Sequence, residues 1–218
     1  MADVVIIGGH GKVALLVLPL LAEAGHSATA VIRNPAHAAD VEAAAGTPLV
    51  LDVENATEDE LAAAFTGRDA IVWSAGAGGG DTRRTYAVDR DAAIRSMDAA
   101  ARAGVRRYVM VSYLGAGPDH GVPEDNSFHA YAEAKAAADA HLRASGLDWT
   151  VLGPAGLTLE EPTGLIDVAP LPEDAERRVS RANVARTIVA ALELDATIGR
   201  TIEYVDGATP IREALARV

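Results

Sequence analysis

Two side chains in the segment FHAYAEAKAAADAHL have the types and the spacing that proton transfer requires. Tyr131 and Lys135 are four residues apart, so a helix over this segment places both on one face. A free phenol has a pKa of about 10 and exchanges a proton near neutral pH only when a cation lies close. Lys135 would be such a cation, which makes Tyr131 a candidate acid–base group. Because an alanine-rich helix can carry this spacing by chance, the pair indicates chemistry only together with other motifs.

The glycine-rich segment VVIIGGHGKVA, from Val4 to Ala14, joins a short apolar strand to a helix. Glycine loses backbone entropy on folding and packs nothing, so three glycines here indicate that the backbone itself must approach a ligand. The spacing fits G-x-x-G-x-x-A from Gly8 and G-x-G-x-x-A from Gly9, which is typical of a turn that holds a dinucleotide pyrophosphate at a helix N-terminus. The residues expected to contact the dinucleotide are Gly8, Gly9, His10, Gly11, Lys12 and Val13.

The end of the second expected strand bears on the choice between the two nicotinamide coenzymes. NAD binders carry a carboxylate there for the ribose hydroxyl, whereas this segment reads VIRNP and offers Arg33 for an additional phosphate. Lys12 could add a second cation. We therefore expect NADP(H) as the coenzyme, with NADPH preferred over NADH. A solvated surface arginine is the alternative interpretation of Arg33.

Small and polar residues after the next two strands would continue the coenzyme site. Asp52 could reach the adenine amino group, or could equally cap the turn that follows it. Ser74, Ala75 and Gly76 form a small-residue edge against which a ribose could lie. The glycines of Gly78–Gly80 predict a loop that would suit a lid.

Apolar strands alternate with alanine-rich helical stretches, a pattern that predicts a parallel sheet covered on both faces. Right-handed crossovers then give an α/β, Rossmann-type doubly wound sheet of about six or seven strands. The expected strands are Val4–Ile7, Ala28–Ile32, Pro48–Leu51, Ala70–Ser74, Arg107–Ser112, Trp149–Leu152 and Thr201–Val205. The expected helices cover residues 12–24, 35–45, 58–66, 84–103, 126–145, 181–193 and 210–217.

The stretch 153–180 breaks this alternation, since it contains Pro154, Pro162, Pro170 and Pro172. We expect irregular structure there, over the ligand crevice, rather than core strands. Together with the C-terminal segment it would form a small substrate-side region. The whole chain, residues 1–218, is expected to be a single domain, because this length suits one core.

Composition and charge exclude several classes of protein. The 218 residues include no cysteine, and the formal net charge is −12, so neither a disulfide framework nor a thiolate metal site is available. No basic stripe for a nucleic acid is visible. The longest apolar run, from Val13 to Ala22, is too short to span a bilayer, and the N-terminus shows no secretory signal. We expect a cytoplasmic protein whose partner is a small molecule, without a metal site.

Taken together, these motifs resemble the short-chain dehydrogenase/reductase superfamily. Within it, the chain looks like the atypical, NmrA-like NAD(P)-binding members, which include NAD(P)-dependent epimerases and dehydratases. The resemblance spans nearly the full length. It rests on the segments GGHGKVA, VIRNP, VLDVEN, WSAGAGGG, YAVDRDAA, RYVMVSYLGA, YAEAK, LDWTVLGPAGLT and VSRANVARTIVAAL.

The resemblance implies roles for several residues. Tyr131 and Lys135 would be the catalytic pair and would also contact the coenzyme, with Lys135 and an oxidised nicotinamide favouring the phenolate. Ser112 would orient the substrate. Asp89 falls where many relatives carry an active-site asparagine, and it could hold the Lys135 ammonium by a charge-assisted contact. The other implied coenzyme contacts are Val53 beside the adenine and Pro154, Ala155, Gly156 and Leu157 at the nicotinamide end.

Departures from the superfamily pattern leave the function open. Tyr113 follows Ser112 where relatives often have a second serine, Gly153–Ala155 replaces an Arg-Pro-Gly sequence, and the C-terminal region is short for a sugar-nucleotide pocket. We expect an NADP(H)-dependent oxidoreductase acting on a small carbonyl compound. A non-catalytic NmrA-like coenzyme sensor and an epimerase or dehydratase are the alternatives. The long helices expected over 84–103 and 126–145 are compatible with a homodimer, and a monomer is equally compatible with the sequence.

Overall fold

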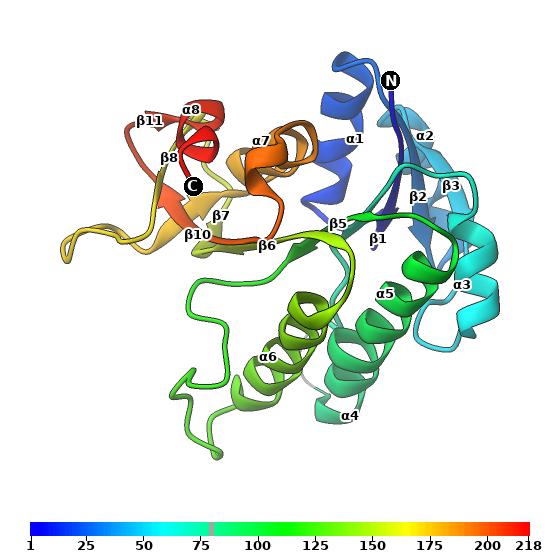
Figure 1. Ribbon diagram of the computed structural model, residues 1–218, viewed down its shortest axis with the longest axis horizontal. Coiled ribbons are helices and arrows are strands. Elements are labelled where there is room, and N and C mark those ends of the chain that lie inside the picture. Colours follow the sequence, from blue (N-terminus) through cyan, green and yellow to red (C-terminus); the bar gives the residue numbers. More distant parts are fainter. Residues whose placement is uncertain (79–80) are drawn as a thin grey trace.

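The computed structural model describes residues 1–78 and 81–218, and its main feature is a nine-stranded sheet (Figure 1). Gly79 and Gly80, which belong to the expected lid, lie outside the described residues. The strand order is β11-β8-β10-β6-β5-β4-β1-β2-β3, and β7 and β9 pair separately. The strands are β1 Asp3–Ile7, β2 Ser27–Ile32, β3 Thr47–Val50, β4 Ala70–Trp73, β5 Arg107–Val111, β6 Asp148–Pro154, β7 Gly156–Thr158, β8 Leu165–Val168, β9 Arg178–Ser180, β10 Arg200–Asp206 and β11 Thr209–Pro210.

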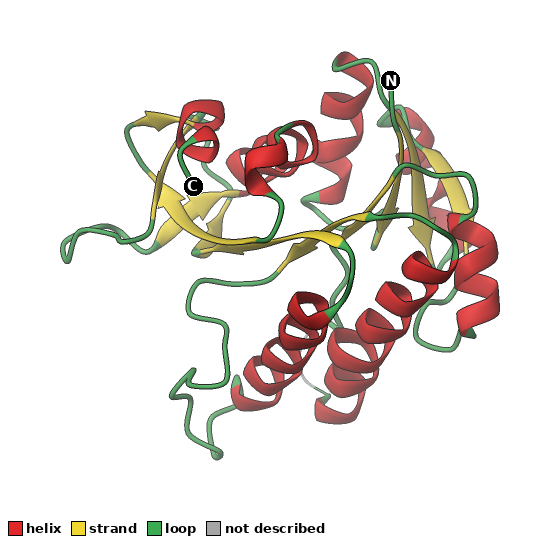
Figure 2. Ribbon diagram, viewed as in Figure 1, coloured by secondary structure: helices red, strands yellow, loops and turns green. Residues whose placement is uncertain are grey.

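Helices cover both faces of this sheet, as Figure 2 shows. Alternate residues of each strand supply two separate cores: Val4 and Ile6 of β1 lie in one, and Val5 and Ile7 lie in the other. The first core also receives α1, α2, α7 and α8, and the second receives α3, α5 and α6. The helices are α1 Ala14–Glu23, α2 Ala38–Ala43, α3 Glu58–Phe65, α4 Thr82–Thr85, α5 Ala93–Arg102, α6 His129–Ala144, α7 Arg181–Glu193 and α8 Ile211–Ala216, with the short 3-10 helices η1 Pro35–His37 and η3 Asp195–Thr197.

Strand β1 marks the point where the strand order reverses. It pairs in parallel with β2 on one side and with β4 on the other, so that Ile7 lies opposite both Val31 and Trp73. The loop that follows β1 therefore emerges between the carboxyl ends of its two neighbours. In an open parallel sheet this reversal creates a crevice at the ends of the strands, which is where ligands bind.

The doubly wound fold expected from the sequence is confirmed, and each expected strand and helical stretch corresponds to an element of the structure. The expected number of about six or seven strands is too low, because β8 and β11 extend the main sheet to nine strands. The expectation for residues 153–180 is wrong in part, because this stretch contains β7, β8 and β9. Strand β8 joins the main sheet antiparallel to β10. Pro162 and Pro170 lie on either side of β8 rather than within it, so the prolines interrupt no ladder of hydrogen bonds.

The expected helix over 84–103 differs from a regular α-helix in its first half. Residues Tyr86–Ala92 form a π-helical segment, η2, between α4 and α5. Such π-helical turns are rare in proteins, and many of those that occur lie at functional sites. Asp89 lies on this segment and is buried.

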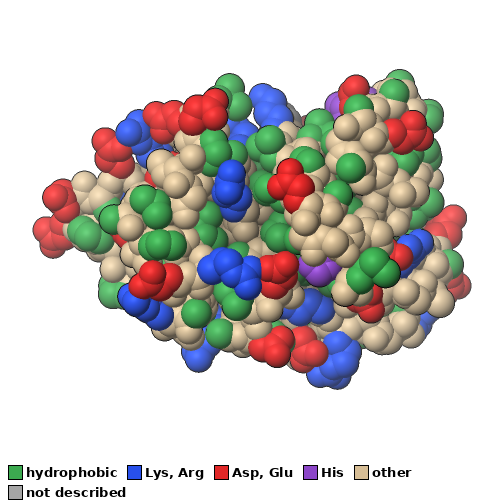
Figure 3. All heavy atoms as spheres, turned by 90° about the horizontal axis from the view of Figure 1, so that it is seen from above, with side chains coloured by type: hydrophobic (Ala, Val, Ile, Leu, Met, Phe, Trp, Pro, Cys, Tyr) green, Lys and Arg blue, Asp and Glu red, His purple; other side chains and the backbone are tan. Residues whose placement is uncertain are grey.

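Two features of the described residues concern membranes and nucleic acids: the length of the apolar helices and the distribution of surface charge. None of the helices that the structure describes is long and apolar enough to cross a membrane. On the face drawn in Figure 3, acidic and basic side chains are interspersed rather than separated into fields of one sign. This distribution offers no basic stripe on that face.

Candidate functional site

A cleft of about 360 Å³ lies where the strand order reverses, at the carboxyl ends of β1 to β4. Half of the residues expected to bind the coenzyme line it: Gly8, His10, Gly11, Arg33, Asp52, Val53, Ser74, Ala75 and Gly76. They come from four loops that the parallel pairing of the strands brings to one edge of the sheet. This position is the one that a dinucleotide occupies in folds of this topology.

Glycines form the floor of the cleft for steric reasons. Gly8 has a φ of +85°, and a Cβ at this position would lie only 2.6 Å from the Cα of Ala75. A Cβ on Gly9 would lie 2.5 Å from the Cβ of Ala30. The N–H of Gly11 donates to the carbonyl of Gly8 at 2.8 Å and closes the turn. The exposed backbone at the head of α1 fits the pyrophosphate of a dinucleotide.

Three of the expected coenzyme residues in the glycine-rich segment do not line this cleft. Gly9 is buried against Ala30, and Val13 is buried in the core beside α1. Lys12 is exposed and borders a separate cavity of about 630 Å³ next to α1 and residues 158–162. The chain has already turned toward α1 at Lys12. Lys12, which was expected as a possible second cation beside Arg33, therefore does not line the cleft.

His10 lines the cleft in an arrangement that the sequence did not indicate. Its ring stacks on that of His37 with 3.7 Å between the centroids, and its Nε2 is 2.8 Å from Oδ2 of Asp40. Within residues 1–78 and 81–218, no group of three or more His, Cys, Asp or Glu side chains is placed to hold a metal ion.

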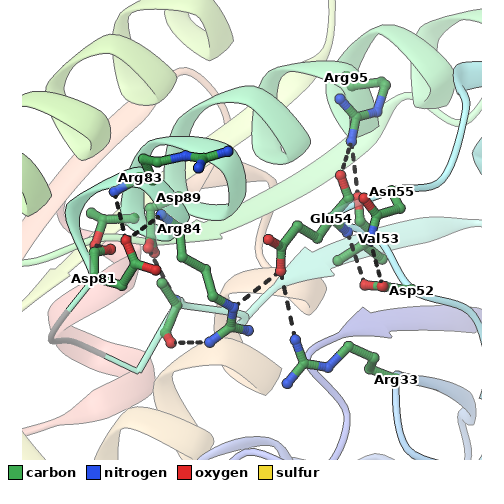
Figure 4. Close-up of polar contacts among 12 residues, drawn as sticks. Arg33, Asp52, Val53, Glu54, Asn55, Asp81, Arg83, Arg84, Asp89 and Arg95 are labelled. Atoms are coloured by element: carbon green, nitrogen blue, oxygen red, sulfur yellow. Dashed lines mark hydrogen bonds and ion pairs between the residues drawn. The ribbon is translucent and has the colours of Figure 1, made fainter.

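Charged side chains gather at the end of the cleft beyond β2 and β3 (Figure 4). Nη1 of Arg33 is 3.6 Å from Oε2 of Glu54, which also accepts a hydrogen bond of 3.0 Å from Nε of Arg84. Asp52 caps its own turn, since its carboxylate accepts from the N–H of Glu54 and, at 2.8 Å, from Nδ2 of Asn55. Its contact with an adenine stays a prediction, because the same side chain also lines the cleft.

A second pocket, of about 430 Å³, lies at the ends of β5 and β6. The rings of Tyr113, Phe128 and Tyr131 contact one another there, with centroids 5.1 to 5.7 Å apart. The pocket is therefore walled by aromatic faces and carries few charged groups. Six of the expected site residues line it: Ser112, Tyr131, Pro154, Ala155, Gly156 and Leu157.

Behind this pocket, α6 turns two charged side chains into the protein. Lys135 and Asp139, one helical turn apart, are 1% and 0% exposed. Nζ of Lys135 donates to the carbonyl of Val111 at 2.9 Å, and the hydroxyl of Ser112 donates to Oδ2 of Asp139 at 2.5 Å. In the described part of the chain, Oδ1 of Asp139 has no hydrogen-bond partner. A buried carboxylate of this kind is stable only next to a positive charge, which Lys135 provides.

The surroundings of Tyr131 hold its phenol in the neutral form. Burial raises the pKa of Tyr131 above its ordinary value, and the negative charges of Asp89 and Asp139 raise it further. Burial also lowers the pKa of Lys135, while the same two carboxylates oppose that change. The expectation that Lys135 together with an oxidised nicotinamide favours the phenolate concerns the coenzyme-bound protein and stays a prediction. Without coenzyme, Tyr131 carries its proton.

Asp89 lies close to Lys135 without touching it. Oδ2 of Asp89 accepts the N–H of Ala77 at 3.0 Å, and its Oδ1 has no partner among the residues that the structure describes. Burial raises the pKa of Asp89, and the N–H of Ala77 and the charge of Lys135 only partly offset this effect. The direct contact expected between Asp89 and Lys135 is not formed, because the π turn directs Asp89 to the loop after β4.

We expect Asp89→Asn to raise the melting temperature by a few degrees at about pH 8. The folded-state pKa of Asp89 is raised, so the ionised carboxylate destabilises the folded chain, and a neutral amide removes this effect. The wild-type carboxyl becomes protonated as the pH falls through its folded-state pKa, so the gain should shrink on acidification. Thermal unfolding over a pH series measures it. A gain of equal size at about pH 4 would contradict the assignment.

Several residues of the site escaped the analysis of the sequence. Asp139 follows Lys135 by four residues and Tyr131 by eight, and this helical spacing could have indicated a shared face. Glu54 and Arg84 are 30 residues apart, and only the folded chain brings them together. Phe128 enters the aromatic pocket from a turn before α6, where no periodicity marks it.

Comparison with known proteins gives matches over nearly the whole chain. Residues 8–195 match the model of a family described as NAD(P)H-binding. The chain is 37% identical to the Bacillus subtilis (strain 168) protein "Uncharacterized sugar epimerase YhfK", with 99% of both chains covered. Among solved structures, the "Putative NAD-dependent epimerase/dehydratase" from Bacillus halodurans has a TM-score of 0.91 at 30% identity, with 100% of both chains covered. The oxidoreductase ylbE from Lactococcus lactis has a TM-score of 0.85 at 29% identity, covering 99% of this chain and 96% of its own.

Proposed function

Since the chain belongs to the NAD(P)H-binding family, we propose that it is an oxidoreductase that uses NADP(H) and acts on a small carbonyl compound. One observation carries this proposal: the glycine-floored cleft and the aromatic pocket lie at the ends of neighbouring strands, β4 and β5, on the same edge of the sheet. A dinucleotide in the cleft can therefore extend toward a substrate beside Tyr131.

The hydroxyl of Tyr131 is the proton donor in this proposal. Bound NADPH would supply the hydride. Tyr131, kept neutral by burial and by two carboxylates, would give its proton to the carbonyl oxygen of the substrate. Lys135 would stabilise the phenolate left after proton transfer by its charge rather than by contact, because its ammonium is bonded to the carbonyl of Val111, and the phenolate would regain its proton from solvent. The hydroxyl of Ser112 donates its hydrogen bond to Asp139. Toward a substrate, Ser112 would therefore act as a hydrogen-bond acceptor and not as a donor.

The aromatic pocket favours a small, largely apolar substrate. Its lining includes the rings of Tyr113 and Phe128, the residues Gly156 and Leu157, and one cation, Arg177. A sugar nucleotide needs several cations for its phosphates and many hydrogen-bonding groups for its hydroxyls, and this lining offers few of either. A planar carbonyl compound stacks well on aromatic faces.

Epimerisation or dehydration is the second candidate function, because the names of the Bacillus subtilis and Bacillus halodurans relatives point to it. The fate of the coenzyme separates the candidates. An oxidoreductase consumes NADPH in proportion to the carbonyl compound reduced, whereas an epimerase regenerates it within each cycle. A coenzyme sensor would leave NADPH unchanged with every compound. The decisive experiment is a panel of aldehydes, ketones and quinones followed at the nicotinamide absorbance, with product analysis.

Arg33→Ala is expected to weaken NADPH binding about tenfold and to leave NADH binding nearly unchanged. The reason is that a guanidinium gains a charge-assisted hydrogen bond from the additional phosphate, which NADH lacks. Fluorescence titration with each coenzyme measures the two dissociation constants. Arg83→Ala is a matched control, since Arg83 is exposed and does not line the cleft. Equal losses for NADPH and NADH in Arg33→Ala would refute the phosphate assignment.

A further inference from the structure

A carboxylate lies between two guanidinium groups in the cleft. Oε2 of Glu54 is 3.0 Å from Nε of Arg84 and 3.6 Å from Nη1 of Arg33 (Figure 4). The three side chains come from the end of β2, the loop after β3 and helix α4, and all three line the cleft. Two cations that converge on one anion form an arrangement that also suits a phosphoryl group.

Contacts that do not involve Glu54's side chain hold the other parts of this arrangement in place. Arg84 also donates to the carbonyl of Ala77, so one end of its guanidinium is fixed independently. Nη2 of Arg95 donates to the carbonyls of Val53 and Glu54, each at 3.0 Å, and fixes the loop from behind. Neutralising the Glu54 side chain should therefore leave both Arg84 and the loop where they are.

The exposure of the three side chains differs in a way that bears on binding. Arg33 is 57% exposed, Arg84 is 33% exposed and Glu54 is 24% exposed. Arg33 is thus free to follow an incoming anion, whereas Arg84 and Glu54 form a firmer wall. A dianionic phosphoryl group is attracted by both arginines and repelled by Glu54, but a neutral ribose hydroxyl can donate a hydrogen bond to Glu54.

We propose that Arg33 and Arg84 together form the site for the additional phosphate of NADP(H), and that Glu54 is a resident anion that competes with this phosphate and limits the preference over NAD(H). This inference rests on the proposed use of NADP(H). Glu54 is then a specificity-determining residue that works against the two arginines. It would keep NADH binding measurable in a chain whose cations favour NADPH.

The test compares Glu54→Gln and Arg84→Met with the wild-type protein. Titrations use NADPH, NADH and adenosine 2′,5′-bisphosphate, which carries the additional phosphate without a nicotinamide. Glu54→Gln should tighten the binding of NADPH and of the bisphosphate about three- to tenfold, with NADH unchanged or weaker. Arg84→Met should weaken both phosphate-bearing ligands about five- to tenfold and change NADH less than about twofold. Glu23→Gln, at the far end of α1, is the charge-matched control.

Each outcome bears on the inference. Unchanged or weaker NADPH binding in Glu54→Gln overturns the role of Glu54, and equal losses for both coenzymes in Arg84→Met overturn the two-cation site. Because Arg84→Met removes contacts to Ala77 and Glu54, its thermal unfolding is measured alongside. The near-isosteric Glu54→Gln remains informative if Arg84→Met unfolds. If Arg33→Ala weakens the binding of NADPH but not of NADH, while Glu54→Gln and Arg84→Met do not give the expected changes, only this inference is lost. If Arg33→Ala weakens the binding of both coenzymes equally, the proposed coenzyme itself is wrong.

Discussion

Replacing Tyr131 with phenylalanine should lower kcat about 10²- to 10⁴-fold with a carbonyl acceptor, while the dissociation constant of NADPH changes less than about threefold. The hydroxyl is the only part removed, and the ring keeps its contacts with Phe128 and Tyr113. The pocket therefore keeps its shape and loses its neutral proton donor. Steady-state kinetics with the acceptor found in the panel, together with coenzyme titration, measures both effects.

Tyr113→Phe is the matched control for this prediction. It removes a second hydroxyl from the same aromatic cluster, and this hydroxyl has no hydrogen-bond partner within residues 1–78 and 81–218. Loss of an unpaired buried hydroxyl should leave kcat within about threefold of the wild-type value. If Tyr131→Phe retains full activity, or if both variants lose activity equally, Tyr131 is not the proton donor.

Lys135→Met should lower the free energy of unfolding by about 3–5 kcal/mol near pH 7, because it leaves buried Asp139 without its positive neighbour. Asp139 is 0% exposed and already has one oxygen without a partner. Urea unfolding measures the loss, and the size expected is a large part of the stability of an ordinary domain. The loss should shrink on acidification, since the pKa of Asp139 is raised by burial and the protonated acid needs no counter-ion.

The double variant Lys135→Met/Asp139→Leu tests whether the two charges act as a pair. An apolar pair of similar volume removes both buried charges, so much of the lost stability should return. Additive losses from the two single replacements would contradict the pairing. Arg83→Met is the control, because it removes an exposed positive charge on α4 that does not act on Asp139.

The fold was predictable because its signals are local. Val4–Ile7 is apolar throughout, as a strand buried on both faces must be, and the glycines after it mark the turn into α1. The alternation of such strands with helices then leaves few topologies. The pairing of β8 with β10 was not predictable, because an antiparallel strand of four residues at a sheet edge depends on tertiary contacts.

The candidate site was predictable where backbone geometry decides it and not where distant side chains meet. Gly8 and Gly11 follow from the shape of the turn, and they line the cleft. The inward direction of Lys135 depends on the carbonyl of Val111 in another element, and the π turn around Asp89 depends on packing. Arg33 could be predicted from its position after a strand. Glu54 could not, because only the folded chain places it between Arg33 and Arg84.

The two rim strands of the sheet set a limit on how this chain can associate with other chains. One rim, β3, contains Pro48, and the other, β11, has two residues and ends in Pro210. Proline has no N–H to offer to an added strand, and a two-residue rim is too short to act as a template for polymerisation. Edge-to-edge pairing of the nine-stranded sheets of two copies is therefore disfavoured at both edges.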